Sequence, residues 1–186
     1  PLVVSYQTST NAVRQDAQAL IKQWWGELGI QADLRNIDAS VFFGGDPASP
    51  DTFQKFFADV EMYTNNFAGV DPEAYMANWT CKEWPSPESQ WQGSNMQRFC
   101  DPAYDALSLE LAATAGIEAR SELVKQMNDM LMQSFSIIPL VHRGGVSACP
   151  FLTSDATDDL LRAVLCYCRF LSKKHTYQQH ALHLIL

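Results

Sequence analysis

The chain has 186 residues, of which 47% are hydrophobic and 18% are charged, a usage typical of a globular protein. Its net charge of −8 argues against nucleic acid, because phosphates are bound by clustered Lys and Arg, and against an anionic membrane surface. No stretch approaches the roughly 20 apolar residues that a membrane-spanning helix needs.

The N-terminal segment has the pattern of a β-α-β unit. Residues 2–6 predict a buried strand, and Thr8, Ser9 and Thr10 follow as candidate N-caps of a helix. The helix is predicted over about 11–28. Its apolar residues at helical spacing are Val13, Ala17, Leu20, Ile21, Trp24 and Leu28.

A second strand is predicted after this helix. Gly29 suits the left-handed position that ends a helix, and apolar residues alternate over about 30–37. A strand, a helix and a strand in succession predict parallel pairing with a right-handed crossover.

The helix and strand predicted next, in the middle of the chain, are short. A short helix is expected over 52–57 and a strand over 58–64. Asp71 and Pro72 then match the N-cap and first position of a further helix. Residues 80–100 lack periodicity and form a long loop, which is usually functional or cross-linked.

The remaining periodic segments are two helices and a strand. The helices are predicted over about 102–114 and 117–134, with the methionines of the second as core filler. The strand covers 136–142. The overall pattern is α/β, with helices packed on a mixed sheet.

Five cysteines are present, an odd number that does not suggest a complete disulfide framework. Cys81 and Cys100 flank the long loop, and spacing alone leaves a disulfide and two free thiols equally open. Cys166 and Cys168 fall one residue short of the usual metal-binding spacing. His175, His180 and His183 match no zinc motif either, so we expect no metal and no cofactor.

Candidates for catalysis are weak. His142 could serve a hydrolase as a base, but no nucleophile motif accompanies it, and a structural histidine is the better interpretation. Asp59, Glu61 and Asp71 could be paired carboxylates; alternation would place Asp59 and Glu61 on one face of a strand, and we interpret that face as solvated.

The segment 63–72 favours binding over catalysis. It leaves the end of a predicted strand, where ligands bind in α/β sheets, and it carries aromatic and amide side chains. Its candidate ligand-binding residues are Tyr63, Asn65, Asn66, Phe67 and Asp71. A plain strand-to-helix connection would have a similar composition.

Several short motifs, taken in order, carry a resemblance to a known family. They are Asn11-Ala12-Val13-Arg14, Trp25 to Ala32, Tyr63 to Pro72, Gly93-Ser94-Asn95, Asp101 to Leu107, Arg120 to Leu123 and Ile137 to Leu140. Over about residues 2–148 the chain resembles family 5 of the bacterial extracellular solute-binding proteins, the dipeptide- and oligopeptide-binding proteins of ABC importers.

The resemblance implies a periplasmic-binding-protein-like lobe of the type II, peptide-binding class. Residues 1–148 would be part of the C-terminal lobe of a two-lobed clamp that binds a small solute or peptide without catalysis and docks on ABC permease subunits. The N-terminal lobe, the signal peptide and a periplasmic location would follow from a segment upstream. The family's dipeptide binders also carry a disulfide at the positions of Cys81 and Cys100.

The resemblance assigns roles at the proposed binding segment. Peptide binders of this family have a tryptophan at the strand end and, shortly after it, an aspartate that pairs with the α-amino group of the peptide. Tyr63 and Asn66 stand at those positions here. The aromatic character is kept but the charge is lost, so either the solute lacks a free amino group or another acid supplies the charge.

The resemblance ends at Ala148. Residues 149–186 are rich in Cys, His and Leu, and we expect a frameshifted or foreign segment that takes no part in solute binding. The alternative is a free-standing interaction module that docks on a partner through this tail.

Overall fold

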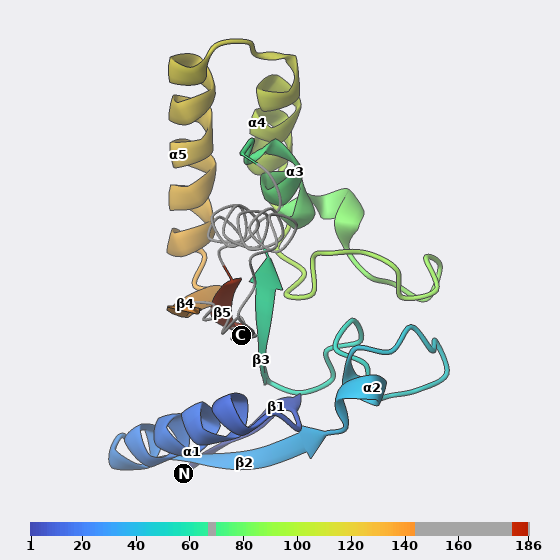
Figure 1. Ribbon diagram of the computed structural model, residues 1–186, viewed down its shortest axis with the longest axis vertical. Coiled ribbons are helices and arrows are strands. Elements are labelled where there is room, and N and C mark those ends of the chain that lie inside the picture. Colours follow the sequence, from blue (N-terminus) through green and yellow to red (C-terminus); the bar gives the residue numbers. More distant parts are fainter. Residues whose placement is uncertain (67–69, 144–179, 186) are drawn as a thin grey trace, which may run out of the picture.

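The computed structural model describes residues 1–66, 70–143 and 180–185 of the chain, which form a mixed five-stranded sheet with helices (Figure 1). The strands are β1 (Leu2–Ser9), β2 (Ile30–Ile37), β3 (Val60–Asn66), β4 (Ile137–Arg143) and β5 (His180–Ile185). Their order is β2-β1-β3-β5-β4. The predicted α/β class and mixed sheet are therefore confirmed.

The β-α-β unit forms as predicted. Helix α1 (Ala12–Glu27) joins β1 to β2, which pair in parallel from Leu2↔Ile30 to Ser9↔Ile37. Gly29 has φ +79, the left-handed conformation expected after the helix. The predicted N-caps were wrong: β1 continues through Ser9, and Asn11 caps α1 instead by accepting a hydrogen bond from the Arg14 N–H.

Helix α1 buries only part of the face that its apolar spacing indicated, since Ile21 and Ala17 pack in the core cluster and the other members do not. Gln18 and Ile21 are buried against β1, where the Gln18 amide donates to the Tyr6 carbonyl at 2.8 Å. A line of apolar side chains lies instead in solvent: Val13 (53% exposed), Leu20 (51%), Trp24 (57%) and Leu28 (76%). A buried glutamine thus takes the place that a purely hydrophobic pattern assigns to an aliphatic residue.

The segment between β2 and β3 contains one short helix in an unexpected place. Helix α2 (Ala39–Phe42) follows β2 directly, and the Asp38 carboxylate caps it by accepting from the Ser40 N–H at 2.8 Å. The helix predicted over 52–57 was wrong, because those residues form turns that place Phe53 against Phe42.

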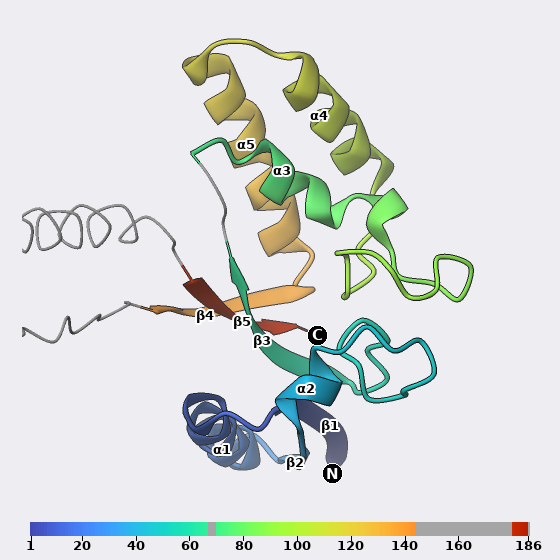
Figure 2. The same cartoon turned by 45° about the vertical axis from the view of Figure 1, so that its right-hand side comes forward.

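A helical layer stands above the sheet at the end of β3 (Figures 1 and 2). It contains α3 (Glu73–Met76), α4 (Pro102–Ala113) and α5 (Ile117–Gln133), with the short 3-10 turns η1 (Ala77–Trp79) and η2 (Cys81–Glu83). Helices α4 and α5 match their predicted ranges to within a residue or two. Their core includes Tyr104, Leu111 and Met127, all fully buried, so the methionine interpretation is confirmed for Met127.

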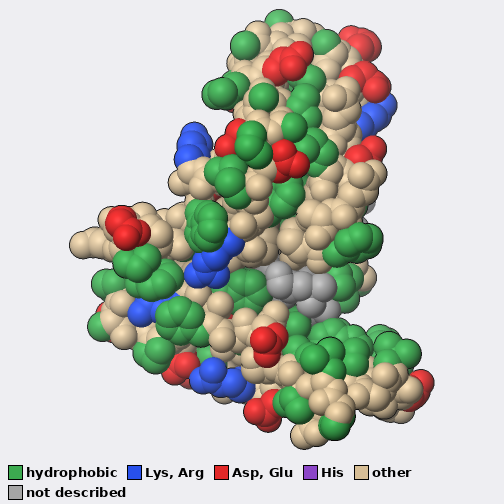
Figure 3. All heavy atoms as spheres, turned by 180° about the vertical axis from the view of Figure 1, so that it is seen from behind, with side chains coloured by type: hydrophobic (Ala, Val, Ile, Leu, Met, Phe, Trp, Pro, Cys, Tyr) green, Lys and Arg blue, Asp and Glu red, His purple; other side chains and the backbone are tan. Residues whose placement is uncertain are grey.

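The surface of this helical hairpin mixes apolar and acidic side chains (Figure 3). Leu109 and Ile117 are 75% and 83% exposed, and they stand apart from the buried cluster. Within the described ranges, no helix is long and apolar enough to cross a membrane.

Strand β5 brings the end of the chain into the sheet. It pairs antiparallel with β3, from Glu61↔Ile185 to Asn66↔His180, and antiparallel with β4 on its other side. The other strands all run in one direction, so β5 is the single antiparallel member of the described sheet. Part of the segment 149–186 therefore completes the sheet that the first 148 residues begin.

Candidate functional site

The candidate site lies where β1 and β3 end. These strands are parallel neighbours, paired at Tyr6↔Val60, so their carboxyl ends meet at one edge of the sheet. Asn65 and Asn66 are the last two residues of β3 at this edge, and the Asn65 side chain is partly buried. Phe67 lies outside the described residues.

Tyr63 is packed inside the protein. Its side chain is 6% exposed and lies in an aromatic cluster with Phe42 and Met96, and its ring centroid is 5.2 Å from that of Phe53. Burial, reinforced by the charge of Glu61, raises the pKa of the Tyr63 phenol. In this arrangement the ring supports the edge from within and offers no open face for stacking, so its predicted contact with a solute stays a prediction.

Arg14 is a charged residue at the edge that the sequence analysis did not single out as a binding residue. It lies in the first turn of α1, donates to the Ser9 hydroxyl, and has its Nη2 atom 3.4 Å from the Thr64 hydroxyl. Its guanidinium carbon lies 5.2 Å from the centre of the Phe43 ring. The Arg14 side chain thus links the ends of β1 and β3. In the sequence, the only feature that pointed to Arg14 was its position in the first turn after the helix N-cap.

Asp71, just before the start of α3, forms an ion pair with Arg120, which is distant in the sequence. Its carboxylate and that of Glu73 both accept from Arg120, at 2.7 Å and 2.8 Å. Two hydrogen bonds lower the pKa of the Asp71 carboxyl. The larger effect comes from the Glu73 backbone N–H and the next from the Arg120 side chain. Arg120 also donates to the Leu111 and Thr114 carbonyls, so it ties the start of α3 to the end of α4. Asp71 therefore already has a structural partner.

The interpretation of Asp59 and Glu61 as a solvated face was wrong for Glu61. Its side chain is fully buried, and its Oε1 atom accepts from the Gln7 amide on β1. Burial raises the pKa of Glu61 well above its ordinary value, although the Gln7 amide and the Arg98 charge oppose this. Asp59, two residues earlier, is exposed and accepts from the Ser5 N–H and hydroxyl at 2.7 Å and 2.6 Å. The two carboxylates therefore lie in different environments, one buried in β3 and one exposed before it.

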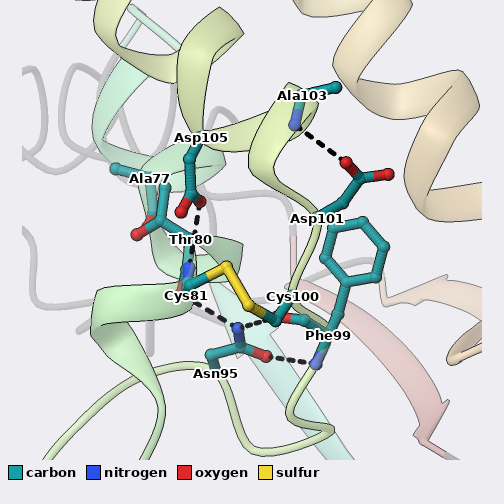
Figure 4. The surroundings of a disulfide bond; sticks show 9 residues. All are labelled: Ala77, Thr80, Cys81, Asn95, Phe99, Cys100, Asp101, Ala103 and Asp105. Carbon is teal, nitrogen blue, oxygen red and sulfur yellow. Dashed lines mark hydrogen bonds between the residues drawn. A yellow bond between two sulfur atoms is a disulfide. The ribbon is translucent and has the colours of Figure 1, made fainter.

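A disulfide joins Cys81 to Cys100, as the resemblance implied (Figure 4). The loop inside it is organised by Asn95, which is fully buried. The Asn95 amide donates to the Thr80 and Phe99 carbonyls at 3.0 Å and 2.6 Å, and its oxygen accepts from the Phe99 N–H at 3.1 Å. The disulfide and this side chain together close the loop at the base of α4.

The Gly93-Ser94-Asn95 motif has a steric explanation. The N–H groups of Ser94 and Asn95 both donate to the Glu83 carbonyl at 3.0 Å. Gly93 has φ +148, and a Cβ at this position would lie 2.3 Å from the same carbonyl oxygen. Only glycine lets the backbone approach this closely.

The remaining sequence candidates gain no further support. His142 lies in β4 opposite Ala181, and its side chain is not among the described parts. His180 and His183 are in β5, while Cys166, Cys168 and His175 lie outside the described residues. Within the described portion, no group of three or more His, Cys, Asp or Glu side chains could hold a metal ion.

The fold is that of a periplasmic-binding-protein-like lobe. The chain is similar to the structure of the Escherichia coli murein tripeptide binding protein MppA, with a TM-score of 0.59 and 19% sequence identity. The match covers 72% of this chain and 23% of that protein, so the chain spans about a quarter of the length of its structural relative. No protein-family model matches the chain, and no curated protein sequence matches it.

Proposed function

We propose that the chain is part of the C-terminal lobe of a solute-binding protein that delivers a peptide-like solute to an ABC importer. The observation that carries this proposal is the lobe fold shared with a tripeptide-binding protein. A binding role without catalysis is in keeping with the chemistry at the edge of β1 and β3, where amides, hydroxyls and aromatic rings predominate. A periplasmic location and docking on permease subunits belong to the same proposal.

The proposed contacts with the solute are the amides of Asn65 and Asn66 and the aromatic residue Phe67, with Tyr63 supporting the strand end. Asp71 is assigned a supporting role, since Arg120 and the Glu73 backbone already occupy its carboxylate. This leaves no acid at the Asn66 position to balance a ligand ammonium group. The proposal therefore favours a peptide whose amino end is blocked or bound elsewhere.

Replacing Asn66 with Asp should create affinity for a free amino group. In a two-lobed protein assembled from the full reading frame, we expect Asn66→Asp to bind the tripeptide Ala-Ala-Ala about 10- to 100-fold more tightly, because a hydrogen bond between charged groups contributes about 1.5–3 kcal/mol. Isothermal titration calorimetry measures this change.

Two controls make the result specific. N-acetylated Ala-Ala-Ala should bind the variant no better than the wild type. Asn36→Asp adds the same charge at the exposed end of β2 and should leave both affinities unchanged. Equal gains for the free and blocked peptides would contradict the assignment of Asn66 to the amino-group position.

The isolated chain should bind peptides weakly, because it lacks the second lobe that would enclose the solute. Titration of residues 1–186 with Ala-Ala-Ala, free or N-acetylated, is expected to give a dissociation constant far above the micromolar range. A submicromolar constant would show that this chain is a complete binding unit and would overturn the clamp mechanism.

We also keep the boundary near residue 148 as a proposal, on the basis of the change in composition there. Deleting residues 149–186 from the two-lobed protein tests whether the tail contributes to binding. The pairing of β5 with Asn65 and Asn66 makes a folding control necessary in that experiment.

A further inference from the structure

Strand β2 forms one end of the described sheet and pairs with β1 along its full length (Figure 1). Along a strand, successive residues direct their backbone N–H and C=O groups to opposite sides. The Ile37 carbonyl accepts from the Thr10 N–H on the β1 side, so Leu34, three residues earlier, directs its backbone groups away from β1. Among the described residues no strand meets these outward groups, which therefore present an edge to which one further strand can be added.

Two side chains of opposite charge lie on either side of Leu34 in this strand. Leu34 packs against the core cluster beneath α1, so its neighbours Asp33 and Arg35 point to the other face of the sheet, and both are exposed. Asp33 makes no hydrogen bond or ion pair within the described part of the chain. Arg35 donates from its Nη2 atom to Asp51 at 3.0 Å, which leaves other N–H groups of the guanidinium available.

These features are complementary to a second copy of the same strand. When two β2 strands are paired antiparallel with Leu34 opposite Leu34, the outward backbone groups of that residue form the reciprocal bonds of a hydrogen-bonded pair. Asp33 of each copy then lies directly opposite Arg35 of the other. These are non-hydrogen-bonded positions, where side chains on neighbouring strands approach most closely. The direction of the backbone groups and the order of the charges therefore favour the same register.

The α1 side of this edge also has room for side chains of an added strand. A shallow hollow lies between the second half of α1 and the start of β2, and its lining consists of Lys22, Gly26, Gly29, Ile30, Gln31 and Ala32. A Cβ placed on Gly26 or on Gly29 would meet no atom within 4 Å, so the space beside both glycines is open. The hollow can therefore take up side chains of a second copy.

We propose that the chain forms a two-fold symmetric dimer in which the β2 strands of two copies pair antiparallel about Leu34 and join the two sheets into one. The interface is isologous, since each copy contributes the same edge and the same two charged residues. Because the partner's strands run in the opposite direction, the carboxyl ends of β1 and β3 in the two copies lie at opposite edges of the joined sheet. Pairing therefore covers neither candidate site, and the inference is independent of solute binding.

Charge reversal in the full chain tests the interface and its register. Asp33→Arg places two arginines on each edge and Arg35→Asp places two aspartates there, so each variant replaces two attractive pairs with two repulsive ones. Each variant alone should self-associate at least about tenfold more weakly than the wild type. A mixture of equal amounts restores opposite charges across the strands and should recover the dimer. Sedimentation velocity distinguishes the dimer from a single chain of 20.9 kDa. Asp129→Arg, an exposed position on α5, is the control and should leave the dimer intact.

Hydrogen exchange of the wild type gives a second readout that needs no substitution, which matters because Arg35→Asp also loses the ion pair with Asp51. The Leu34 N–H should exchange much more slowly at protein concentrations where the dimer predominates, because only the dimer gives it a hydrogen-bond acceptor. Equally fast exchange in monomer and dimer would overturn the proposal, as would a wild type that stays monomeric at every concentration. A dimer that persists in both single variants, or a mixture of folded variants that fails to recover it, would also overturn it.

Discussion

Loss of the Cys81–Cys100 disulfide should lower the free energy of unfolding by about 3 kcal/mol, the chain-entropy estimate for a closed loop of this size. The variant Cys81→Ser/Cys100→Ser removes the bond without reducing agents. The loss should not be complete, because Asn95 still bonds to the Thr80 and Phe99 carbonyls and keeps part of the loop ordered. Urea unfolding followed by circular dichroism measures the difference.

A matched variant separates the disulfide from a general effect of cysteine replacement. Cys149→Ser/Cys166→Ser/Cys168→Ser leaves the bond intact and should change the free energy of unfolding by much less. If the two variants were equally destabilised, the loop would not depend on its covalent closure.

The buried Glu61 should make the protein less stable as pH rises. Its pKa is raised in the folded state, so the carboxyl stays neutral there while the unfolded chain ionises at its ordinary pKa. The stabilisation is complete below the unfolded pKa and is lost as pH rises through the folded pKa. Between these two values the free energy of unfolding should fall by about 1.4 kcal/mol for each pH unit.

Glu61→Gln should remove this pH dependence. The glutamine oxygen can still accept from Gln7, while no charge forms on burial at any pH. Urea unfolding of both proteins at pH 5, 7 and 9 measures the difference, and the variant should gain relative stability toward pH 9. Asp59→Asn, just before the same strand, is the control. The Ser5 hydrogen bonds lower the Asp59 pKa, so its contribution is lost only in more acidic solution than this range, and the stability difference between Asp59→Asn and wild type should stay constant from pH 5 to 9. Parallel pH profiles for wild type and Glu61→Gln would contradict the assignment.

The parts of the fold that sequence predicted well are those governed by local interactions. The boundaries of α1, α4 and α5 follow from glycine and from Asp-Pro at their ends, which act within a few residues. The β1-α1-β2 unit follows because a single short crossover leaves one favourable handedness. Helix α2 was missed because a cap at Asp38 and a four-residue helix give too little periodicity to detect.

The parts that sequence did not predict depend on contacts between distant segments. Nothing in the sequence alternation distinguishes Glu61 from Asp59. The difference arises because Glu61 is buried within β3, where it meets Gln7 of β1 and the charge of Arg98, whereas Asp59 lies exposed just before the strand. Tyr63 was expected at a strand end, but it lies in the middle of β3. Its burial depends on Phe42 and Phe53, which approach from α2 and the turn after it. The rotation of α1 depends in the same way on Gln18 reaching the Tyr6 carbonyl.

The place of β5 sets an order on the folding of the nascent chain. Strand β4 is joined to the rest of the sheet through β5, so the pairing of β3, β5 and β4 waits until residues 180–185 have been synthesised. Until then the ribosome-bound chain carries two open strand edges, at β3 and at β4, of the kind that recruit other chains or chaperones. A translation stop shortly before residue 180 would thus release a product with both edges unpaired.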